Sequence, residues 1–359
     1  MFSLGFGRKK APLLGVDIGS TAVKLIELSQ AGAGSAHTYQ VESCALEPLP
    51  PGAIAERKIA DPQLVGEAIR KAVARSGTRA KAAAVAMPGA AAITKVITLP
   101  AGLADEEMEN QITMDADQYI PYPLEEVDID FTVLGPSVNP GEVDVLLAAA
   151  RHEIAINLII ALEIAGLKAS VIDVEPYALE NACILALGAQ GQGQGQGQTI
   201  AIADIGADAM RIQVMRQGRT LFTREQGFAA SQLFEEVQHR YDLTPEEARR
   251  RVIEMDLPAS FASEVRDPFA AALAQQIGRA LQFFYSSTAA RSADQILLAG
   301  GVAGLPGLDQ VIGASLGITA YVANPFIHMM LGPKVGAQMI QRQGPALAVA
   351  VGLALRRFD

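Results

Sequence analysis

The sequence of 359 residues has no tryptophan, only two cysteines and only four histidines. Cys44 and Cys183 are too few for a disulfide framework, and the histidines stand too far apart to suggest a metal site. The first residues, Met1–Pro12, are basic but lack the apolar core of a signal peptide. These absences favour a soluble protein of a reducing compartment, for which we expect a cytoplasmic location.

One uncharged run, from Gln310 to Pro333, is long enough to be considered as a membrane span. Gly313, Gly317 and the pair Asn324-Pro325 interrupt it, and such residues are typical of turns between short elements. We therefore predict no transmembrane helix in this run.

Positive charge is absent between Lys95 and Arg151. The chain carries a net charge of −10, and this stretch alone contains more carboxylates than that, so the remainder is slightly positive. An acidic chain does not favour nucleic acid as a partner. Two interpretations of this acidic stretch are open. Its carboxylates form the solvated face of a helix and its neighbours, or they create a negative electrostatic field that attracts a basic peptide. The twelve carboxylates are Asp105, Glu106, Glu107, Glu109, Asp115, Asp117, Glu125, Glu126, Asp128, Asp130, Glu142 and Asp144.

Short apolar strands and amphipathic helices share the rest of the chain, which is typical of an α/β fold. At about 150 residues per domain, the length predicts two domains or one large two-lobed unit. A Gly-Gln alternation at 190–198 cannot pack and is predicted to be a loop. The main predicted strands are 13–18, 22–28, 37–44, 82–86, 93–99, 127–134, 143–149, 171–174, 199–205 and 295–299. The predicted helices are 61–76, 105–120, 153–165, 175–187, 228–241, 245–255, 268–286 and 346–356.

The most informative feature is an internal repeat. Val16–Leu25 aligns with Ala203–Ile212, about half the chain later, and each copy reads as strand, aspartate, glycine turn and strand. One Asp-x-Gly is weak evidence, but two copies at this spacing predict a duplicated fold with two facing lobes.

The repeated turns carry groups that bind phosphate. Gly19 and Gly206 open turns whose backbone N–H groups can bind phosphate oxygens. In the first copy, Ser20 and Thr21 add hydroxyl donors and Lys24 adds a point charge. Asp17 and Asp204, at the strand ends, suit a hydrated Mg²⁺. Two facing hairpins of this kind are predicted to hold a nucleoside triphosphate and its metal.

A third glycine element supports this prediction. The strand ending at Ala299 is followed by Gly300-Gly301, where the backbone can approach a nucleoside closely. Neither a Walker A loop nor a G-x-G-x-x-G motif follows a strand anywhere, which disfavours the folds that carry them.

These motifs, in this order and with Glu175-Pro176 between the two repeats, resemble the actin-like ATPase superfamily, which includes the cell-division protein FtsA. Within it, the sequence is most similar to the PilM family of type IV pilus assembly proteins. The resemblance covers nearly the whole chain, and its most specific part is Tyr119–Pro123. The segments that carry it are 14–25, 87–89, 115–123, 298–301 and 352–356.

The resemblance implies a duplicated actin-like (ribonuclease H-like) two-lobed α/β fold with a nucleotide cleft and an FtsA-like inserted subdomain. It implies ATP and Mg²⁺ as cofactors, bound between the lobes. It also implies capture of the N-terminal cytoplasmic tail of PilN beside the insert, in a complex that supports pilus assembly and twitching motility. Other inner-membrane platform or motor proteins are further possible partners, and membrane contact would be indirect, through a partner. We expect a first-lobe core at 1–89 and 330–359, an insert at 90–165, a second-lobe core at 166–226 and 290–329, and a helical subdomain at 227–289.

The same resemblance suggests roles for particular residues. Glu175 opens the helix that matches the catalytic position of the superfamily, so it is the candidate to orient an attacking water; a first-turn glutamate favoured by the helix dipole is the alternative. Tyr119 and Tyr122 are candidates for partner binding, and one arginine of 249–251 for contact with the adenine. The predicted nucleotide-binding residues are Asp17, Gly19, Ser20, Thr21, Lys24, Asp204, Gly206, Gly227, Gly300 and Gly301.

The second turn departs from the superfamily pattern. Asp208 stands where a small or hydroxyl residue is usual, and Met210 where Thr or Ser is common. A carboxylate there repels phosphates unless a metal or the nearby Arg211 offsets it. This departure argues against efficient hydrolysis more than against binding, so we expect at most weak ATPase activity.

Two other function classes fit the sequence less well. A small-molecule kinase needs a substrate lobe for which the duplicated lobes and the insert leave no room. A filament-forming ATPase like FtsA remains the alternative, and sedimentation with ATP would reveal its filaments.

Overall fold

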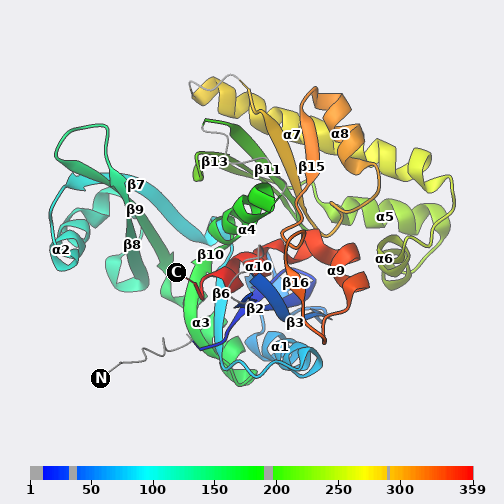
Figure 1. The fold of residues 1–359 in the computed structure, drawn as a ribbon, viewed down its shortest axis with the longest axis horizontal. Helices are drawn as coiled ribbons and strands as arrows, with labels where there is room; N and C mark the ends of the chain where they lie inside the picture. The colour runs from blue at the N-terminus through cyan, green and yellow to red at the C-terminus, as the bar shows by residue number, and fades with distance from the viewer. Residues whose placement is uncertain (1–10, 32–38, 190–196, 289–291, 359) are drawn as a thin grey trace, which may run out of the picture.

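The computed structural model describes residues 11–31, 39–189, 197–288 and 292–358. Two mixed sheets dominate it, and a smaller three-stranded sheet stands apart on one side (Figure 1). The Gly-Gln repeat, for which we predicted a loop, lies almost wholly outside the described residues, as does the basic N-terminus.

The first lobe is built on a six-stranded sheet in the order β10-β6-β1-β2-β3-β16. β1, β2 and β3 form an antiparallel meander, while β6 and β10 run parallel to β1. The strands are β1 (Leu13–Ile18), β2 (Ala22–Gln30), β3 (Tyr39–Pro48), β6 (Ala82–Met87), β10 (Lys168–Val174) and β16 (Met330–Leu331).

The second lobe repeats this plan in a five-stranded sheet, β13-β12-β11-β14-β15. Here β11, β12 and β13 form the antiparallel meander, and β14 and β15 run parallel to β11. β11 therefore stands where β1 stands in the first sheet, as the sequence repeat predicts. The strands are β11 (Thr199–Ile205), β12 (Met210–Arg216), β13 (Arg219–Gln226), β14 (Gln295–Gly300) and β15 (Thr319–Val322).

Two helices, α4 (Glu175–Ala189) and α10 (Ala348–Leu355), lie between the two sheets (Figure 1). Their buried side chains share one apolar core with residues of both sheets, such as Ile26 and Ile202. The helices touch closely because Gly352 has no side chain: a Cβ there would lie 1.7 Å from the carbonyl oxygen of Ala178. One continuous core thus joins the lobes behind the cleft.

Helices cover the outer face of each sheet. α1 (Pro62–Ser76) and α3 (His152–Ile164) pack on the first sheet, and Asp61 caps α1 through the N–H groups of Gln63 and Leu64. α5 (Ala230–Tyr241), α6 (Pro245–Glu254), α7 (Asp267–Ser287) and α8 (Leu308–Leu316) share the apolar core on the outer side of the second sheet. Thr244 and Glu247 form a capping box at the start of α6. α9 (Ala337–Gln343) precedes α10.

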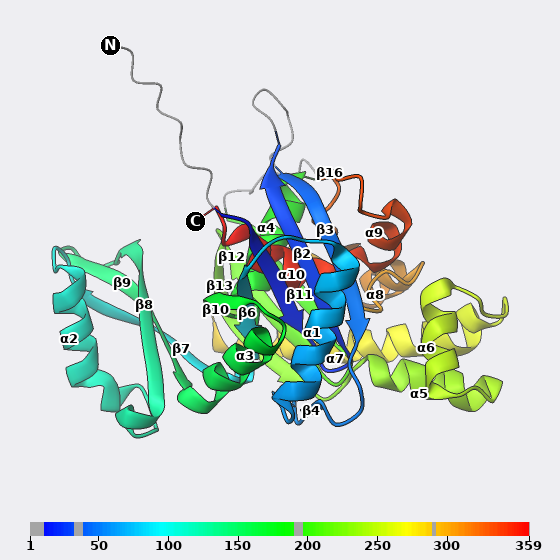
Figure 2. The same ribbon diagram turned by 90° about the horizontal axis from the view of Figure 1, so that it is seen from below.

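The insert is a small unit of its own at one side of the first lobe (Figure 2). Its sheet, β7-β9-β8, packs on α2 (Asp105–Asp115) through Met108 and Ile112. We predicted that this helix would reach residue 120, but it ends at Asp115 in a 3-10 turn, so that Ala116 and Ile120 turn into a second small core. The strands are β7 (Ala92–Pro100), β8 (Val127–Pro136) and β9 (Glu142–Arg151).

One expected boundary is corrected. We expected the insert to extend to residue 165 and the second lobe to begin at 166, but β10 is the edge strand of the first sheet. α3 also belongs there, because Leu158 and Leu162 are buried in the first-lobe core and Gly66 lets α1 approach Ile164. The rest of the four-part division remains a proposal.

The uncharged run at 310–333 is divided between α8, β15 and β16. In the described part of the chain, no helix has the length and apolar character needed to cross a membrane.

Candidate functional site

The first repeat forms the β1–β2 hairpin. Asp17 and Lys24 stand directly opposite each other in its register, and their side chains form an ion pair of 2.7 Å. Asp17 is only 4% exposed. The turn closes through the Gly19 N–H, which donates to the Ala22 carbonyl at 3.1 Å. The hydroxyl residues Ser20 and Thr21 are left at the tip of the hairpin.

The second repeat forms the β11–β12 hairpin in the same register, with Asp204 opposite Arg211. Its turn closes in the same way, from the Gly206 N–H to the Ala209 carbonyl at 3.0 Å. The Gly206 carbonyl also accepts the N–H of Ala230 at the start of α5, which fixes the turn against that helix.

Gly300, at the end of β14, completes the set of glycine elements. Its φ of +97° lies in the region that favours glycine, and a Cβ there would lie 2.3 Å from the carbonyl oxygen of Ile205. A side chain is therefore excluded at this position. A Cβ at Gly301 would meet nothing within 4 Å, so the backbone beside it faces open space.

All three elements line one cleft of about 280 Å³ between the lobes. The structure thus brings together almost all the residues that the sequence singled out for nucleotide binding. The cleft is lined by Asp17, Gly19, Ser20, Thr21, Lys24, Glu175, Asp204, Gly206, Asp208, Gly300 and Gly301, among others.

A network of charged side chains crosses the floor of the cleft. The Arg211 guanidinium donates to Glu175, and lies 3.5 Å from Asp204 and 3.4 Å from Glu225. From the first lobe, Arg57 pairs with Glu225 and lies 3.7 Å from Glu175. The Glu175 carboxylate is therefore held by two guanidinium groups.

Burial shapes the protonation of this network. It raises the pKa of Glu175 and of Asp204, against the opposing charge of Arg211. Burial disfavours the charged forms of Lys24 and Arg211, but the neighbouring carboxylates outweigh it and raise the pKa of both. All four shifts favour the protonated form, which is charged for Lys24 and Arg211 and neutral for Glu175 and Asp204. This balance favours the binding of an anion.

The other end of the cleft is more apolar. Phe234 and Ile253 line it, and the Arg249 guanidinium lies 5.4 Å from the centre of the Phe234 ring. Of the three consecutive arginines, Arg249 is therefore the one that faces the cleft; Arg250 pairs with Glu254. Arg249, Phe234 and the Gly300–Gly301 backbone all line this same cleft.

The residues fit a nucleotide: two glycine turns, hydroxyl groups and cations meet at one end, and apolar surface at the other. For Mg²⁺ the fit is partial. Among the described residues, no group of three or more His, Cys, Asp or Glu side chains is placed to hold a metal ion. Asp17 and Asp204 would therefore act through water, and phosphate oxygens would complete the shell, as Mg²⁺ commonly requires.

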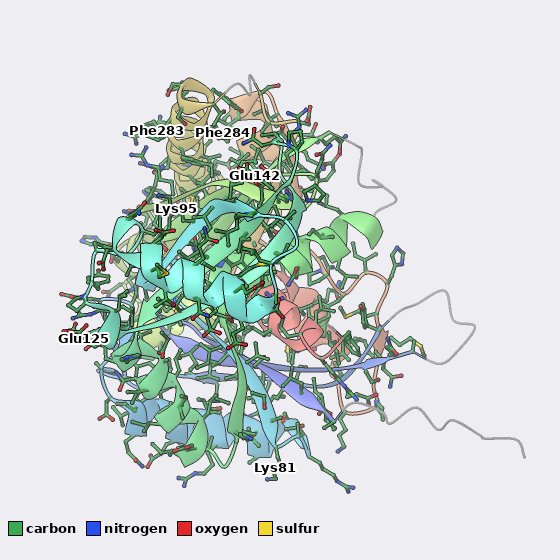
Figure 3. The ribbon with its side chains drawn as sticks, turned by 90° about the vertical axis from the view of Figure 1, so that its left-hand side faces the viewer. Lys81, Lys95, Glu125, Glu142, Phe283 and Phe284 are labelled. Carbon is green, nitrogen blue, oxygen red and sulfur yellow. The ribbon has the colours of Figure 1, made fainter. Side chains whose placement is uncertain are left out.

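Three of the residues for which the sequence predicted a role lie outside the cleft. Gly227 lines a separate hollow with Gln276 and Arg279, not the cleft. In the insert, Tyr119 is half-buried with the Lys95 ammonium 4.7 Å from its ring centre, while Tyr122 is 41% exposed with Arg151 at 5.4 Å. Figure 3 views the insert from outside, with Lys95, Glu125 and Glu142 on it and Phe283 on α7 beyond.

Sequence reasoning missed Arg57 and Glu225. Arg57 lies between two very short strands, β4 (Ile54–Ala55) and β5 (Lys58–Ile59), in a turn without glycine or asparagine. No local signal predicted a hairpin there. Glu225 lies next to the last residue of β13, a strand that is not among the main strands predicted from the sequence.

Comparison with known proteins shows the family. The family model described as "Type IV pilus assembly protein PilM" matches residues 15–358, nearly the whole chain. This chain belongs to that family.

Solved structures agree with this assignment. A chain of the "PilM-PilN type IV pilus biogenesis complex" is 28% identical, with a TM-score of 0.77, over 98% of this chain and 99% of that one. The ethanolamine utilization protein EutJ from Carboxydothermus hydrogenoformans is 18% identical, with a TM-score of 0.56, over 95% of this chain and 88% of that one. The likeness extends over both lobes, and the two-lobed actin-like fold is confirmed.

Proposed function

We propose that this member of the PilM family is a nucleotide-binding scaffold for type IV pilus assembly that holds the N-terminal cytoplasmic tail of a PilN protein. The observation that supports the partner is the likeness, over nearly full length, to a PilM chain solved with PilN. In this role the protein is cytoplasmic, reaches the inner membrane only through its partner, and supports twitching motility.

The two facing hairpins support ATP as the ligand. Asp17 and Lys24 lie at the phosphate end of the cleft, and Asp17 and Asp204 would hold Mg²⁺ through water. Replacing Asp17 and Lys24 together with alanine removes charge-assisted contacts worth about 1.5–3 kcal/mol each, so we expect ATP affinity to fall at least 10-fold. Calorimetric titration measures this, and unchanged affinity would refute the assignment of the site.

Hydrolysis is expected to be weak. Our candidate to orient an attacking water is Glu175, but two guanidinium groups contact its carboxylate. We expect slow phosphate release from the wild type and none from Glu175→Gln, measured over hours with the nucleotide in excess. Equal rates in both proteins would remove the catalytic role of Glu175.

We propose the Tyr119–Pro123 segment of the insert as the site that binds the partner. A synthetic peptide with the sequence of the PilN N-terminal tail is expected to bind the full chain, and Tyr122→Ala to weaken that binding. Phe283→Ala is a matched control, because Phe283 is an aromatic residue 52% exposed on the other lobe. If the wild type does not bind the peptide, the scaffold proposal fails.

Charge is expected to assist this capture. The carboxylates of the insert are mostly exposed, and they attract a basic tail over a distance that salt shortens. We expect peptide affinity to fall with rising ionic strength more steeply than ATP affinity. If it does not fall, the acidic stretch is only a solvated surface.

A further inference from the structure

The β4–β5 hairpin holds two non-glycine residues in left-handed backbone conformation. Its strands pair Ala55 with Lys58, so that Glu56 and Arg57 form a two-residue loop with φ values of 49° and 62°. Two-residue hairpin loops of this geometry normally use asparagine or glycine, because a side chain is strained at positive φ. The strained backbone of this loop places the long cationic side chain of Arg57 in the lining of the cleft.

Arg57 reaches across the cleft from the first lobe to the second. Its guanidinium pairs with Glu225 at the end of β13 and lies 3.7 Å from Glu175. Arg57 and Ile18, the residue directly before the Gly19 turn, line both the cleft and an adjoining hollow. The guanidinium therefore lies at the phosphate end of the cleft.

The two arginines of the network differ in freedom. The Arg211 side chain is 5% exposed, lies in the middle of a sheet and has three carboxylate partners. The Arg57 side chain is 26% exposed and stands on a separate two-stranded hairpin; its partners are Glu225, which is equally exposed, and Glu175 at 3.7 Å. Only Arg57 can change partner without opening a core.

We propose that Arg57 is the residue that distinguishes a nucleoside triphosphate from a diphosphate: it leaves Glu225 and binds the terminal phosphate. A guanidinium binds phosphate in the same two-pronged geometry as a carboxylate, so the exchange keeps its hydrogen bonds. A diphosphate lacks the group that competes with Glu225, and the ion pair between the lobes then stays closed. This inference rests on the proposed nucleotide site and adds a residue that senses the terminal phosphate.

The test compares two ligands on the full-length chain. Affinities for AMPPNP, an ATP analogue that resists hydrolysis, and for ADP are measured by calorimetry with Mg²⁺ present. In Arg57→Ala, AMPPNP is expected to bind about 10-fold more weakly or worse, and ADP less than about threefold more weakly. Arg57→Lys is expected to fall in between, because an ammonium keeps the charge but not the paired geometry.

Two further variants complete the design. Glu225→Gln weakens the competing ion pair and is expected to raise AMPPNP affinity relative to ADP, the opposite of Arg57→Ala. Lys58→Ala removes a positive charge from the same hairpin, but Lys58 lines only the adjoining hollow, so the ratio of affinities should stay that of the wild type.

The outcomes separate this inference from the proposed function. If the wild type binds both ligands and Arg57→Ala weakens both equally, or neither, the sensor role is wrong while the nucleotide site stands. If the wild type binds neither ligand, the nucleotide site itself fails, and the sensor role fails with it.

Discussion

The β1–β2 and β11–β12 hairpins are two copies of one motif with the same register and different uses. In the first, Lys24 forms an ion pair with its own aspartate, and the Lys24 side chain is 20% exposed. In the second, Arg211 is almost fully buried and joins carboxylates from α4, β11 and β13. The first copy leaves its cation partly accessible to a ligand beside one carboxylate, while the second uses its cation to hold three carboxylates together. The sequence repeat therefore predicts where the two basic residues lie. The contacts that each one makes decide whether it can bind a ligand or stabilises the fold.

The largest expected difference between the copies is in stability. Arg211→Ala leaves three carboxylates at the lobe junction without their common cation, and breaking a buried ion pair in this way costs about 3–5 kcal/mol. Lys24→Ala leaves the buried Asp17 carboxylate unpaired, one carboxylate instead of three, so we expect a smaller loss of stability. Thermal unfolding of the two variants at pH 7 measures both, and equal losses would show that the hairpins are equivalent.

A second test moves the carboxylate of one turn into the other. Thr21 aligns with Asp208, so Thr21→Asp places a negative charge at the tip of the ligand-binding hairpin. Repulsion of the phosphates is expected to weaken ATP binding about 10-fold at low salt, equivalent to about 1.4 kcal/mol. Thr21→Asn, similar in size but neutral, is the control and should lose much less in an equilibrium titration.

Glu175→Gln tests the protonation of the α4 carboxylate that contacts Arg211 of the second hairpin. Burial raises the folded-state pKa of Glu175 above its ordinary 4.5, so the native state holds a proton that the unfolded state has already lost. This contribution to stability is complete below about pH 4.5 and is lost as the pH rises through the folded-state pKa. The wild type should therefore lose more stability than Glu175→Gln as the pH rises from 4 towards 7, as Tm values across this range would show. Parallel Tm curves would contradict the raised pKa.

The smallest expected effect comes from Asp208→Thr, which gives the second turn the residue of the first. Asp208 is exposed, so removing its charge should strengthen ATP binding only a few-fold, within about 1 kcal/mol, and the gain should disappear at high salt. Calorimetry at two salt concentrations measures it. A gain that persists at high salt would mean that the turn changes shape rather than charge.

Most of the cleft was predictable from local signals. The Asp-x-Gly turns and the double glycine after β14 depend on short-range geometry that a sequence states directly. Arg57 was not, because its turn lacks the glycine or asparagine that marks positive φ. The placement of β10 was missed for a related reason: an apolar strand reads the same in either sheet.

The sequence by itself predicted the duplicated α/β fold, the two aspartate hairpins and the acidic insert, because periodicity, turn residues and charge are local properties. Only the tertiary structure shows which distant segments touch: Arg211 contacts Glu175, and Arg57 contacts Glu225. It also shows that Arg249 is the arginine that faces the cleft. These depend on how two sheets pack around α4 and α10, and that packing is a property of the whole core, which no single segment encodes.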